Sequence, residues 1–314
     1  MDISERVNTT AIDEEMEPFL VESAELVQKR RSQGRIIFDR FVRNRTAFGS
    51  AIFLIIMVLY CFLGPYLWHV DPNKVNVLDV TSTLAPPSWA HPFGTDDVGR
   101  DQFARAMIGG QYSLIVGMLS MLLGIGIGTL IGALAGFYGG WVDNVLMRVT
   151  DVVLAIPLYL LLFVLSAAFS DGSPRTVILI IAFFSWTYAA RLIRGEFLAL
   201  REREFVMAAR TIGAKNFRLM FRHILPNAAG PIIVNATILV GTNIITESIL
   251  SYFGFGIQPP TSSWGSMIAT GNDYIDADPW LVFVPGLLIF ATVLSFNLVG
   301  DGLRDALDPY MTER

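Results

Sequence analysis

The side chains of this sequence that could carry out chemistry do not form a catalytic set. The three histidines, His69, His91 and His223, fall in different segments and lack the spacing of metal ligands. No glycine-rich GxxxxGK[ST] loop is present to hold the phosphates of ATP. We therefore expect no catalytic residue, no metal site and no cofactor bound by this chain. A membrane-embedded enzyme stays open as an alternative, but it would need a catalytic group that the sequence does not reveal.

Polar side chains within the apolar stretches are candidates for a different task, the lining of a path across a membrane. Ion-driven carriers usually hold an acidic relay or a broken-helix ion site at mid-membrane. The ionisable residues here lie instead at the ends of apolar stretches: Arg148, Asp151, Arg191, Glu247 and Asp301. This pattern favours transport that is driven from outside the chain. The candidate pathway residues are Asn235, Thr242, Asn243, Thr246, Glu247 and Asn297. For the asparagines and threonines, a role as interhelical hydrogen-bond partners is the alternative.

Composition predicts that the elements positioning these residues are membrane-spanning helices. Of the 314 residues, 53% are hydrophobic and only 16% are charged, and the mean hydropathy is +0.51. This is too apolar for a soluble domain of the same length. Runs of about 20 apolar residues are long enough to cross the hydrocarbon core as helices. Six such runs occur, at residues 48–68, 113–137, 145–169, 176–193, 229–249 and 281–299. We predict an all-α integral membrane protein.

The distribution of charge predicts how these helices are oriented. Basic residues precede the first run and gather between the fourth and fifth runs, whereas the segments 69–112 and 250–280 are acidic. By the positive-inside rule, both termini and the segment 194–227 lie on the cytoplasmic side of the cytoplasmic membrane. The polar N-terminus predicts no cleavable signal peptide. The single cysteine, Cys61, lies in an apolar run and is expected to be an inert buried thiol.

The N-terminal part divides into two segments before the first run. Residues 1–34 are acidic first and basic later, which predicts a partly disordered cytoplasmic tail. Within residues 35–47, apolar side chains share one helical face and arginines the other. This predicts an amphipathic helix in the membrane interface, with a plain basic anchor as the alternative. Residues 48–314 would then form the transmembrane domain.

The stretch 204–227 differs from its surroundings because it is short, basic and amphipathic. We predict two short helices separated by Gly213 and closed by Leu225-Pro226, because proline cannot continue the preceding helix. The side chains expected on the apolar faces are Phe205, Ala208, Ala209 and Ile212, then Phe217, Met220, Phe221 and Ile224. Arg218 and Arg222 lie opposite the second set. Such a helical knob suits a groove on another protein.

Two further features concern helix packing. Glycines recur in the second run at a period of four residues: Gly124, Gly128, Gly132, Gly136 and Gly140. Small residues at this spacing let helices approach closely, so we predict a packing seam within the chain or with a partner chain. Pro157 predicts a kink in the third run.

Several motifs together resemble the permease subunits of ATP-binding-cassette (ABC) importers. The stretch 204–227 is similar to the EAA loop of that family, with Met207 at the position of the family's Glu. The residues that match in type and spacing are Ala208, Ala209, Gly213, Leu225 and Pro226. The motifs FGTDDVGRD, ESILSYFGFGIQPPTSSWGSM and NLVGDGLRD follow in the order found in the C-type permeases of dipeptide, oligopeptide and nickel importers. The resemblance runs from about residue 36 to residue 309.

The resemblance implies the six-span permease fold of type I ABC importers, as in the methionine importer permease. It implies that a coupling loop, residues 196–227, docks into an ATPase through Glu204, Ala208, Ala209, Gly213, Arg218, Arg222, Leu225 and Pro226. We predict that Gly213→Pro, or a charge at Ala209, breaks this coupling and leaves membrane insertion intact.

The resemblance also implies the partners and the cargo. The partners are a second homologous permease, one or two cytoplasmic ATPases that carry ATP and Mg²⁺, an extracytoplasmic binding protein, membrane lipid and no nucleic acid. The implied substrate is a peptide, with nickel or another small solute as the alternative. A secondary carrier that works without ATP is the alternative class.

Two acidic or proline-rich outer segments each allow two interpretations. Asp96, Asp97, Arg100 and Asp101 are expected to form local caps and ion pairs, with direct receptor contact as the alternative. The segment 259–265, which includes Trp264, either dips toward the mouth of the pathway or caps the helical bundle.

Overall fold

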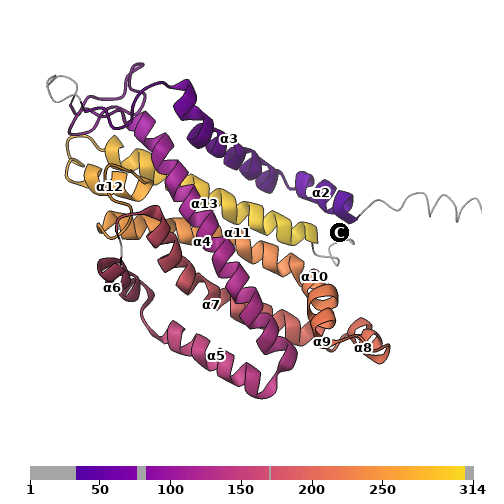
Figure 1. Ribbon diagram of the computed structural model, residues 1–314. Coiled ribbons are helices and arrows are strands. Elements are labelled where there is room, and N and C mark those ends of the chain that lie inside the picture. The colour runs from indigo at the N-terminus through magenta and orange to yellow at the C-terminus, as the bar shows by residue number, and fades with distance from the viewer. Residues whose placement is uncertain (1–32, 76–82, 170, 308–314) are drawn as a thin grey trace, which may run out of the picture.

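The computed structural model describes residues 33–75, 83–169 and 171–307, which form an elongated helical bundle (Figure 1). Its longer helices are α2 (Gln33–Arg43), α3 (Arg45–Leu67), α4 (Gln102–Tyr138), α5 (Gly140–Ala155), α6 (Leu158–Phe169), α7 (Pro174–Leu200), α11 (Ala229–Tyr252), α12 (Trp264–Asn272) and α13 (Trp280–Leu307). Between α7 and α11 lie α8 (Glu204–Thr211), α9 (Asn216–Arg218), the π-helix η2 (Leu219–Ile224) and α10 (Leu225–Asn227). The predicted all-α fold is confirmed. The tail predicted at the N-terminus lies, up to residue 32, outside the described residues.

Five helices in the described part of the chain are long and apolar enough to cross a membrane, namely α3, α4, α7, α11 and α13. The pair α5 and α6 is a sixth span if it is counted as one, but its halves are bent by 83°. Pro157 lies at this break, where its missing N–H and its ring prevent a continuous helix. The predicted kink is therefore confirmed, and it is a break that divides the third run in two.

Helix α4 begins earlier than its apolar run suggested. The segment 69–112 was predicted to be an outer loop, but the helix starts at Gln102, where the Asp101 side chain accepts hydrogen bonds from Phe103 N (2.7 Å) and Ala104 N (3.2 Å). At about 1.5 Å per residue, 37 residues span about 55 Å. This exceeds the hydrocarbon thickness of about 30 Å, so α4 extends beyond the membrane. An aspartate N-cap marked this start in the sequence, but hydropathy alone did not.

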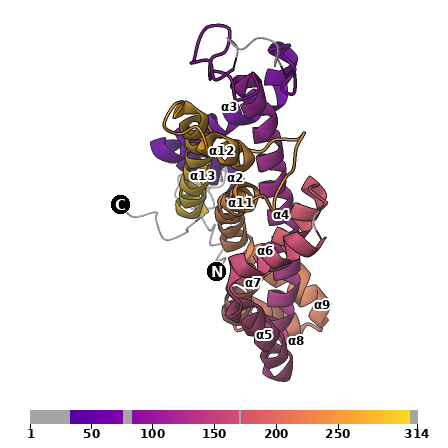
Figure 2. The same cartoon turned by 90° about the vertical axis from the view of Figure 1, so that its left-hand side faces the viewer.

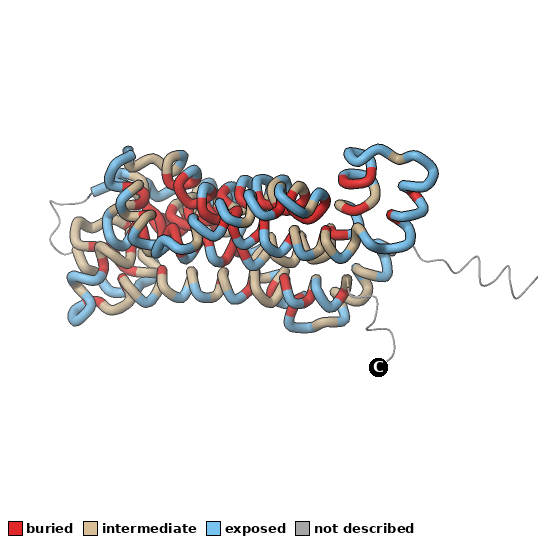
Figure 3. Tube along the Cα trace, turned by 90° about the horizontal axis from the view of Figure 1, so that it is seen from below, coloured by how far each residue is buried: buried red, intermediate tan, exposed pale blue. Residues whose placement is uncertain are grey.

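The glycine stripe of α4 packs against α7 within the same chain. A Cβ atom at Gly128 would lie 2.6 Å from the Ala189 Cβ, and one at Gly132 would lie 2.5 Å from the Ala190 carbonyl oxygen. The backbones can approach this closely only because the glycines have no side chains. The intramolecular seam is therefore confirmed for these positions. Gly140 is not part of it, since it lies beyond α4 in the first turn of α5. Figure 3 shows the buried residues concentrated along the interior of the bundle.

The amphipathic segment near the N-terminus is α2, which ends at Arg43. Asn44 then caps α3 by accepting a hydrogen bond from Ala47 N (3.2 Å), so the first span begins at Arg45 and not near residue 48. A Cβ atom at Gly302 of α13 would meet Phe41 of α2 at 3.4 Å. Helix α2, the end of α13 and the start of α11 therefore lie at one end of the bundle (Figure 1).

The opposite end is closed by α12 and the loops around it. Trp264 is fully buried, and its Nε1 donates to the Ala106 carbonyl of α4 at 2.9 Å. Asp96 pairs with Arg100 at 2.7 Å. Helix α12 lies over α11 and α13 in Figure 2. The segment 259–265 thus leads into a cap on the bundle, and the predicted local caps and ion pairs near Asp96 and Asp101 are confirmed.

Two ion pairs join α5 to α7, and they differ in how far their side chains are buried. We expect them to contribute differently to stability. Arg194 donates from Nε and Nη2 to both carboxylate oxygens of Asp143, whose side chain is only 12% exposed. The Arg191–Asp151 pair joins the same helices at 2.6 Å with both side chains half exposed. We expect Asp143→Asn to lower the free energy of unfolding by about 2 kcal/mol, because the largely buried carboxylate loses its charged hydrogen bonds to the partly exposed Arg194.

The matched variant Asp151→Asn should cost less than about 1 kcal/mol, because water screens the exposed pair. Thermal unfolding of the purified chain in detergent measures both. Equal losses of stability would contradict the assignment of the Asp143 pair as the stronger link.

Candidate functional site

The helical knob (residues 204–227) has an inner side that belongs to the bundle core. Val206 and Ala209 of α8 are buried with Leu219, Met220 and Ile224 in one cluster. The same cluster includes Phe137, Ile193 and Phe197 from the ends of α4 and α7. The knob therefore shares one hydrophobic core with the ends of α4 and α7. Figure 3 shows the knob at one end of the bundle, with its outer side exposed.

The turn between the two halves of the knob depends on Gly213. Its φ is +86°, in the left-handed region that favours glycine, and no atom lies within 4 Å of the position of a Cβ. The predicted break in the helix at Gly213 is confirmed. Proline at this position is incompatible with the turn, since its ring fixes φ near −65°.

The prediction that Leu225-Pro226 closes the unit is wrong. The backbone stays helical through η2 and α10, and α11 follows directly at Ala229. Leu225 N donates to Met220 O, a hydrogen bond that spans five residues and widens the helix. Asn227 Nδ2 donates to the His223 carbonyl at 2.6 Å. The wider turn accommodates Pro226, so the proline bends the chain into α11 without ending it.

The outer side of the knob carries an exposed apolar surface. Ile212 is 86% exposed, Phe217 73% and Met207 53%, and the rings of Phe217 and Phe221 lie 4.6 Å apart. We call Met207, Ile212, Phe217 and Phe221 the docking surface. Several exposed large apolar side chains on one short segment indicate a site of interaction with another protein. The other exposed predicted residues are Glu204, Ala208, Gly213, Arg218, Arg222 and Pro226, and Leu225 is half-buried.

One predicted face of the first helix is corrected. Ala208 and Ala209 were expected to share an apolar face with Phe205 and Ile212, but Ala209 is only 6% exposed and packs inward. The reason is that Val206, fully buried, sets the inner face three residues before Ala209. A charge at Ala209 would therefore disrupt the knob's own core and would not test docking.

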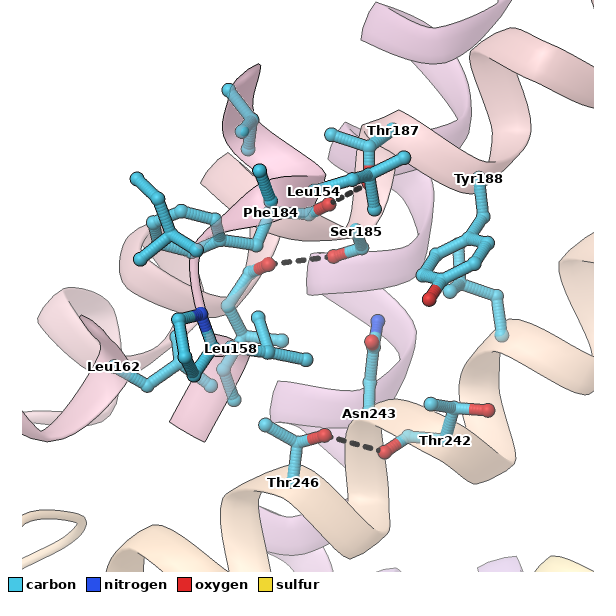
Figure 4. A pocket seen from close by; sticks show the side chains of 16 residues that line it. Leu154, Leu158, Leu162, Phe184, Ser185, Thr187, Tyr188, Thr242, Asn243 and Thr246 are labelled. Carbon is cyan, nitrogen blue, oxygen red and sulfur yellow. Dashed lines mark hydrogen bonds between the residues drawn. The ribbon is translucent and has the colours of Figure 1, made fainter. Parts of the chain in front are cut away.

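A second candidate site is a cavity of about 300 Å³ where α5 bends into α6, beside α7 and α11 (Figure 4). Of the six candidate pathway residues, Thr242, Asn243 and Thr246 line it. The helix α7 adds Ser185, Thr187 and Tyr188, and the bend adds Ile156 and Pro157. The structure therefore brings half of the candidates together with polar residues that the sequence reasoning missed.

The remaining three candidates lie outside this cavity. Asn235 is half-buried on α11. The Asn297 amide oxygen lies 3.7 Å from the position of a Cβ at Gly241, between α13 and α11. Glu247 is fully buried. Their assignment to a transport pathway stays a prediction.

Comparison with known proteins places this geometry in a family. The family model described as the binding-protein-dependent transport system inner membrane component matches residues 128–313. The N-terminal TM domain of oligopeptide transport permease C matches residues 32–87. The chain belongs to this family of transport permeases.

Curated relatives cover most of this permease. It is 40% identical over 270 residues to the oligopeptide transport system permease protein OppC of Bacillus subtilis, covering 86% of this chain and 87% of that protein. It is 39% identical over 279 residues to the glutathione transport system permease protein GsiD of Pectobacterium atrosepticum, covering 89% and 92%. It is 39% identical over 280 residues to the dipeptide transport system permease protein DppC of Alkalihalophilus pseudofirmus, covering 89% and 91%.

The permease also resembles a solved structure. A chain of the MetNI methionine ABC transporter in an inward-facing conformation matches with a TM-score of 0.54 and 19% identity, over 66% of this chain and 98% of that chain. This similarity supports the fold, and it confirms the predicted likeness to the methionine importer permease.

Glu247 forms the centre of a buried hydrogen-bond network in the permease. Its carboxylate accepts from Ser113 Oγ of α4 (2.9 Å) and from Ser251 Oγ (2.6 Å). Trp264 N, at the start of α12, donates in turn to Ser113 Oγ (3.3 Å). The network joins α4, α11 and α12, a role that the position of Glu247 near the end of a run did not indicate.

We expect Glu247→Leu to destabilise the permease by about 2–6 kcal/mol, because two buried hydroxyl groups lose their acceptor and each costs about 1–3 kcal/mol. Glu247→Gln retains one acceptor oxygen and should cost about half as much. The thermal unfolding temperature and the proteolytic sensitivity of the segment before α12 are the measurements. A Glu247→Leu variant as stable as the unmodified chain would contradict the structural role.

Proposed function

We propose that this permease forms, with a second homologous permease, a pathway that imports peptides across the cytoplasmic membrane. The relatives named for oligopeptide, glutathione and dipeptide transport support a peptide substrate. A binding protein outside the membrane would deliver the peptide. The subunit itself would be non-catalytic and would bind no cofactor, while one or two partner ATPases carry ATP and Mg²⁺.

The observation that carries this proposal is the form of the knob. Its docking surface is apolar and exposed, and the same knob carries four exposed basic residues, Arg210, Lys215, Arg218 and Arg222. Its inner side is continuous with the core at the ends of α4 and α7. An ATPase bound to the docking surface would therefore move helices and not merely a loop.

Alternating access follows from this linkage. Closure of the ATPases on ATP would displace the knob and the attached ends of α4 and α7. The cavity borders α7 and the α5–α6 bend, so its shape would change with that displacement. A switch of this kind requires that nucleotide binding stabilises one of two arrangements of the helices.

The same geometry supports an orientation in the membrane. The knob, α2 and the end of α13 lie at one end of the bundle, and the basic residues of the knob are at this end (Figure 1). By the positive-inside rule this end would face the cytoplasm, and we propose that both termini are cytoplasmic.

The test is purification of the tagged permease from native membranes under mild conditions, followed by reconstitution in liposomes. We expect a second permease and one or two ATPases to co-purify, and import of labelled tri-alanine to require ATP and the binding protein. A chain that purifies alone and takes up solute along an ion gradient would be a secondary carrier. If nickel is imported with ATP and peptide is not, the proposed peptide substrate is wrong, and the proposed importer architecture stands.

A further inference from the structure

The cavity at the α5–α6 bend has a lining without charge. None of its lining residues is Asp, Glu, Lys, Arg, His or Cys. A carboxylate or ammonium group that entered would lose hydration without gaining a counter-charge. A metal ion would find no preferred ligand. The group that fits this cavity is therefore uncharged.

The serine and threonine hydroxyl groups of the lining already donate their hydrogens within the chain, whereas the Tyr188 hydroxyl is a further polar group of the lining. Ser185 donates to the Ile181 carbonyl (2.6 Å), Thr187 to the Phe184 carbonyl (2.9 Å) and Thr246 to the Thr242 carbonyl (2.9 Å), as the dashed lines in Figure 4 show. Thr242 likewise donates to the Ile238 carbonyl at 3.2 Å. A hydroxyl has one hydrogen to donate, so these four groups offer a ligand only acceptor oxygens.

Asn243 is different because its amide donor is unused. The residue is 2% exposed, and its Nδ2 is buried without a hydrogen-bond partner among the described residues. A buried donor without a partner costs free energy, so such a group calls for an explanation. In Figure 4 the Asn243 amide and the Tyr188 hydroxyl point toward the same space between α11 and α7.

We infer that this cavity is a subsite for a backbone amide of the transported peptide, with Asn243 Nδ2 donating to its carbonyl oxygen. The inference rests on the proposed function and specifies what the pathway recognises. An amide carbonyl is an uncharged acceptor that is repeated along every peptide. A volume of about 300 Å³ lies at the lower end of the range for small-molecule pockets, which suits a short stretch of peptide and not a whole oligopeptide.

Recognition of this kind has a consequence for specificity. The subsite binds a group that all peptides share, and no charged residue in it distinguishes their side chains or termini. It would hold successive peptides in the pathway irrespective of sequence, and the choice among sequences would belong to the binding protein.

The first test compares amide and ester substrates in the reconstituted importer with all its partners. The probes are tri-alanine and two analogues in which one amide is replaced by an ester, whose carbonyl is a weaker acceptor. We expect the unmodified permease to import tri-alanine about three- to tenfold faster than at least one ester, the effect of one neutral hydrogen bond. In Asn243→Leu this ratio should fall toward one, without a lower melting temperature. Any preference of the binding protein for amide over ester affects the unmodified permease and Asn243→Leu equally, because both are assayed with the same binding protein. The difference between their two ratios therefore reports on the permease.

Thr292→Val is the matched control. Thr292 is also fully buried and its Oγ1 also has no partner in the described residues, but it lies on α13 and does not line the cavity. Its amide-to-ester ratio should equal that of the unmodified permease. An unchanged ratio in Asn243→Leu would overturn the inference and leave Asn243 a structural residue.

The second test does not depend on transport. In the same complex, a cysteine in place of Thr242, an exposed lining residue, is labelled with a maleimide in the presence of N-acetylalanine methylamide. The native Cys61 is fully buried and should not react. We expect at least threefold protection that Asn243→Leu abolishes. Protection without peptide import would retain the subsite and refute the proposed function. Absence of protection would overturn the subsite. A partner's side chain that fills the cavity in the assembled complex would overturn it as well.

Discussion

Replacing Gly132 with leucine should prevent the permease from assembling its bundle. The Cβ of the new side chain would lie 2.5 Å from the Ala190 carbonyl oxygen and 3.0 Å from Arg194 N, so the backbone of α7 itself would have to move. Overpacking of a core costs about 1–3 kcal/mol for a few added methylenes, and contact with backbone raises the cost further. We expect a loss of at least about 3 kcal/mol. Size-exclusion profiles and the melting temperature of the purified chain measure it.

Gly126→Leu is the control for this experiment because it lies on the same helix. No atom lies within 4 Å of the position of its Cβ, and the residue is exposed on the outer face of α4. A leucine there adds the same volume and the same loss of backbone freedom, and it should leave the bundle intact. If both variants unfold equally, close packing of the glycine stripe against α7 does not explain the loss of stability in Gly132→Leu.

Replacing Ile212 with aspartate should uncouple the permease from its ATPases without unfolding it. Ile212 is 86% exposed, the largest exposed fraction among the four residues of the docking surface, so the substitution disturbs no packing within the chain. Apolar side chains at the centre of an interface each contribute about 2 kcal/mol or more. We expect co-purification of the ATPases to weaken by at least about 30-fold, and ATP-driven import to be lost.

Two variants separate docking from folding in this experiment. Trp89→Asp removes an equally exposed large apolar side chain from an outer segment, and it should leave the ATPases bound. Ala209→Asp places a charge in the core of the knob and should lower the melting temperature, which Ile212→Asp should not. If the ATPases remain bound to the Ile212→Asp variant, the proposal that they bind to the docking surface is wrong.

The glycine stripe and the break at Pro157 could be predicted because they depend on local geometry. Glycines every four residues on one helix face predict the close approach of another backbone. A proline removes one backbone hydrogen bond from a helical run and so predicts a distortion, although α3 and α13 continue through Pro65 and Pro285. The size of the bend, 83°, could not be predicted, because it depends on how the two halves pack in the bundle and not on the proline alone.

The knob shows where sequence reasoning reached its limit. The amphipathic pattern correctly placed two helical segments and the glycine turn. It did not determine which apolar residues face inward, because both sides of α8 carry apolar side chains. Tertiary contact with Phe137 and Phe197 buried Val206 and Ala209 and left Ile212 outside.

The sequence by itself determined the class of this protein. The length and spacing of its apolar runs and the segregation of basic residues indicated a multi-span membrane protein, because both follow from the cost of placing polar groups in lipid. The order of its motifs supplied the resemblance to a family of permeases. Only the tertiary structure decided the roles of the polar residues on α11. Thr242, Asn243 and Glu247 share one helix, yet the first two line a cavity and the third joins three helices. The reason is that a polar side chain in a membrane takes whichever partner the neighbouring helices bring to it, and the spacing along one helix does not record that partner.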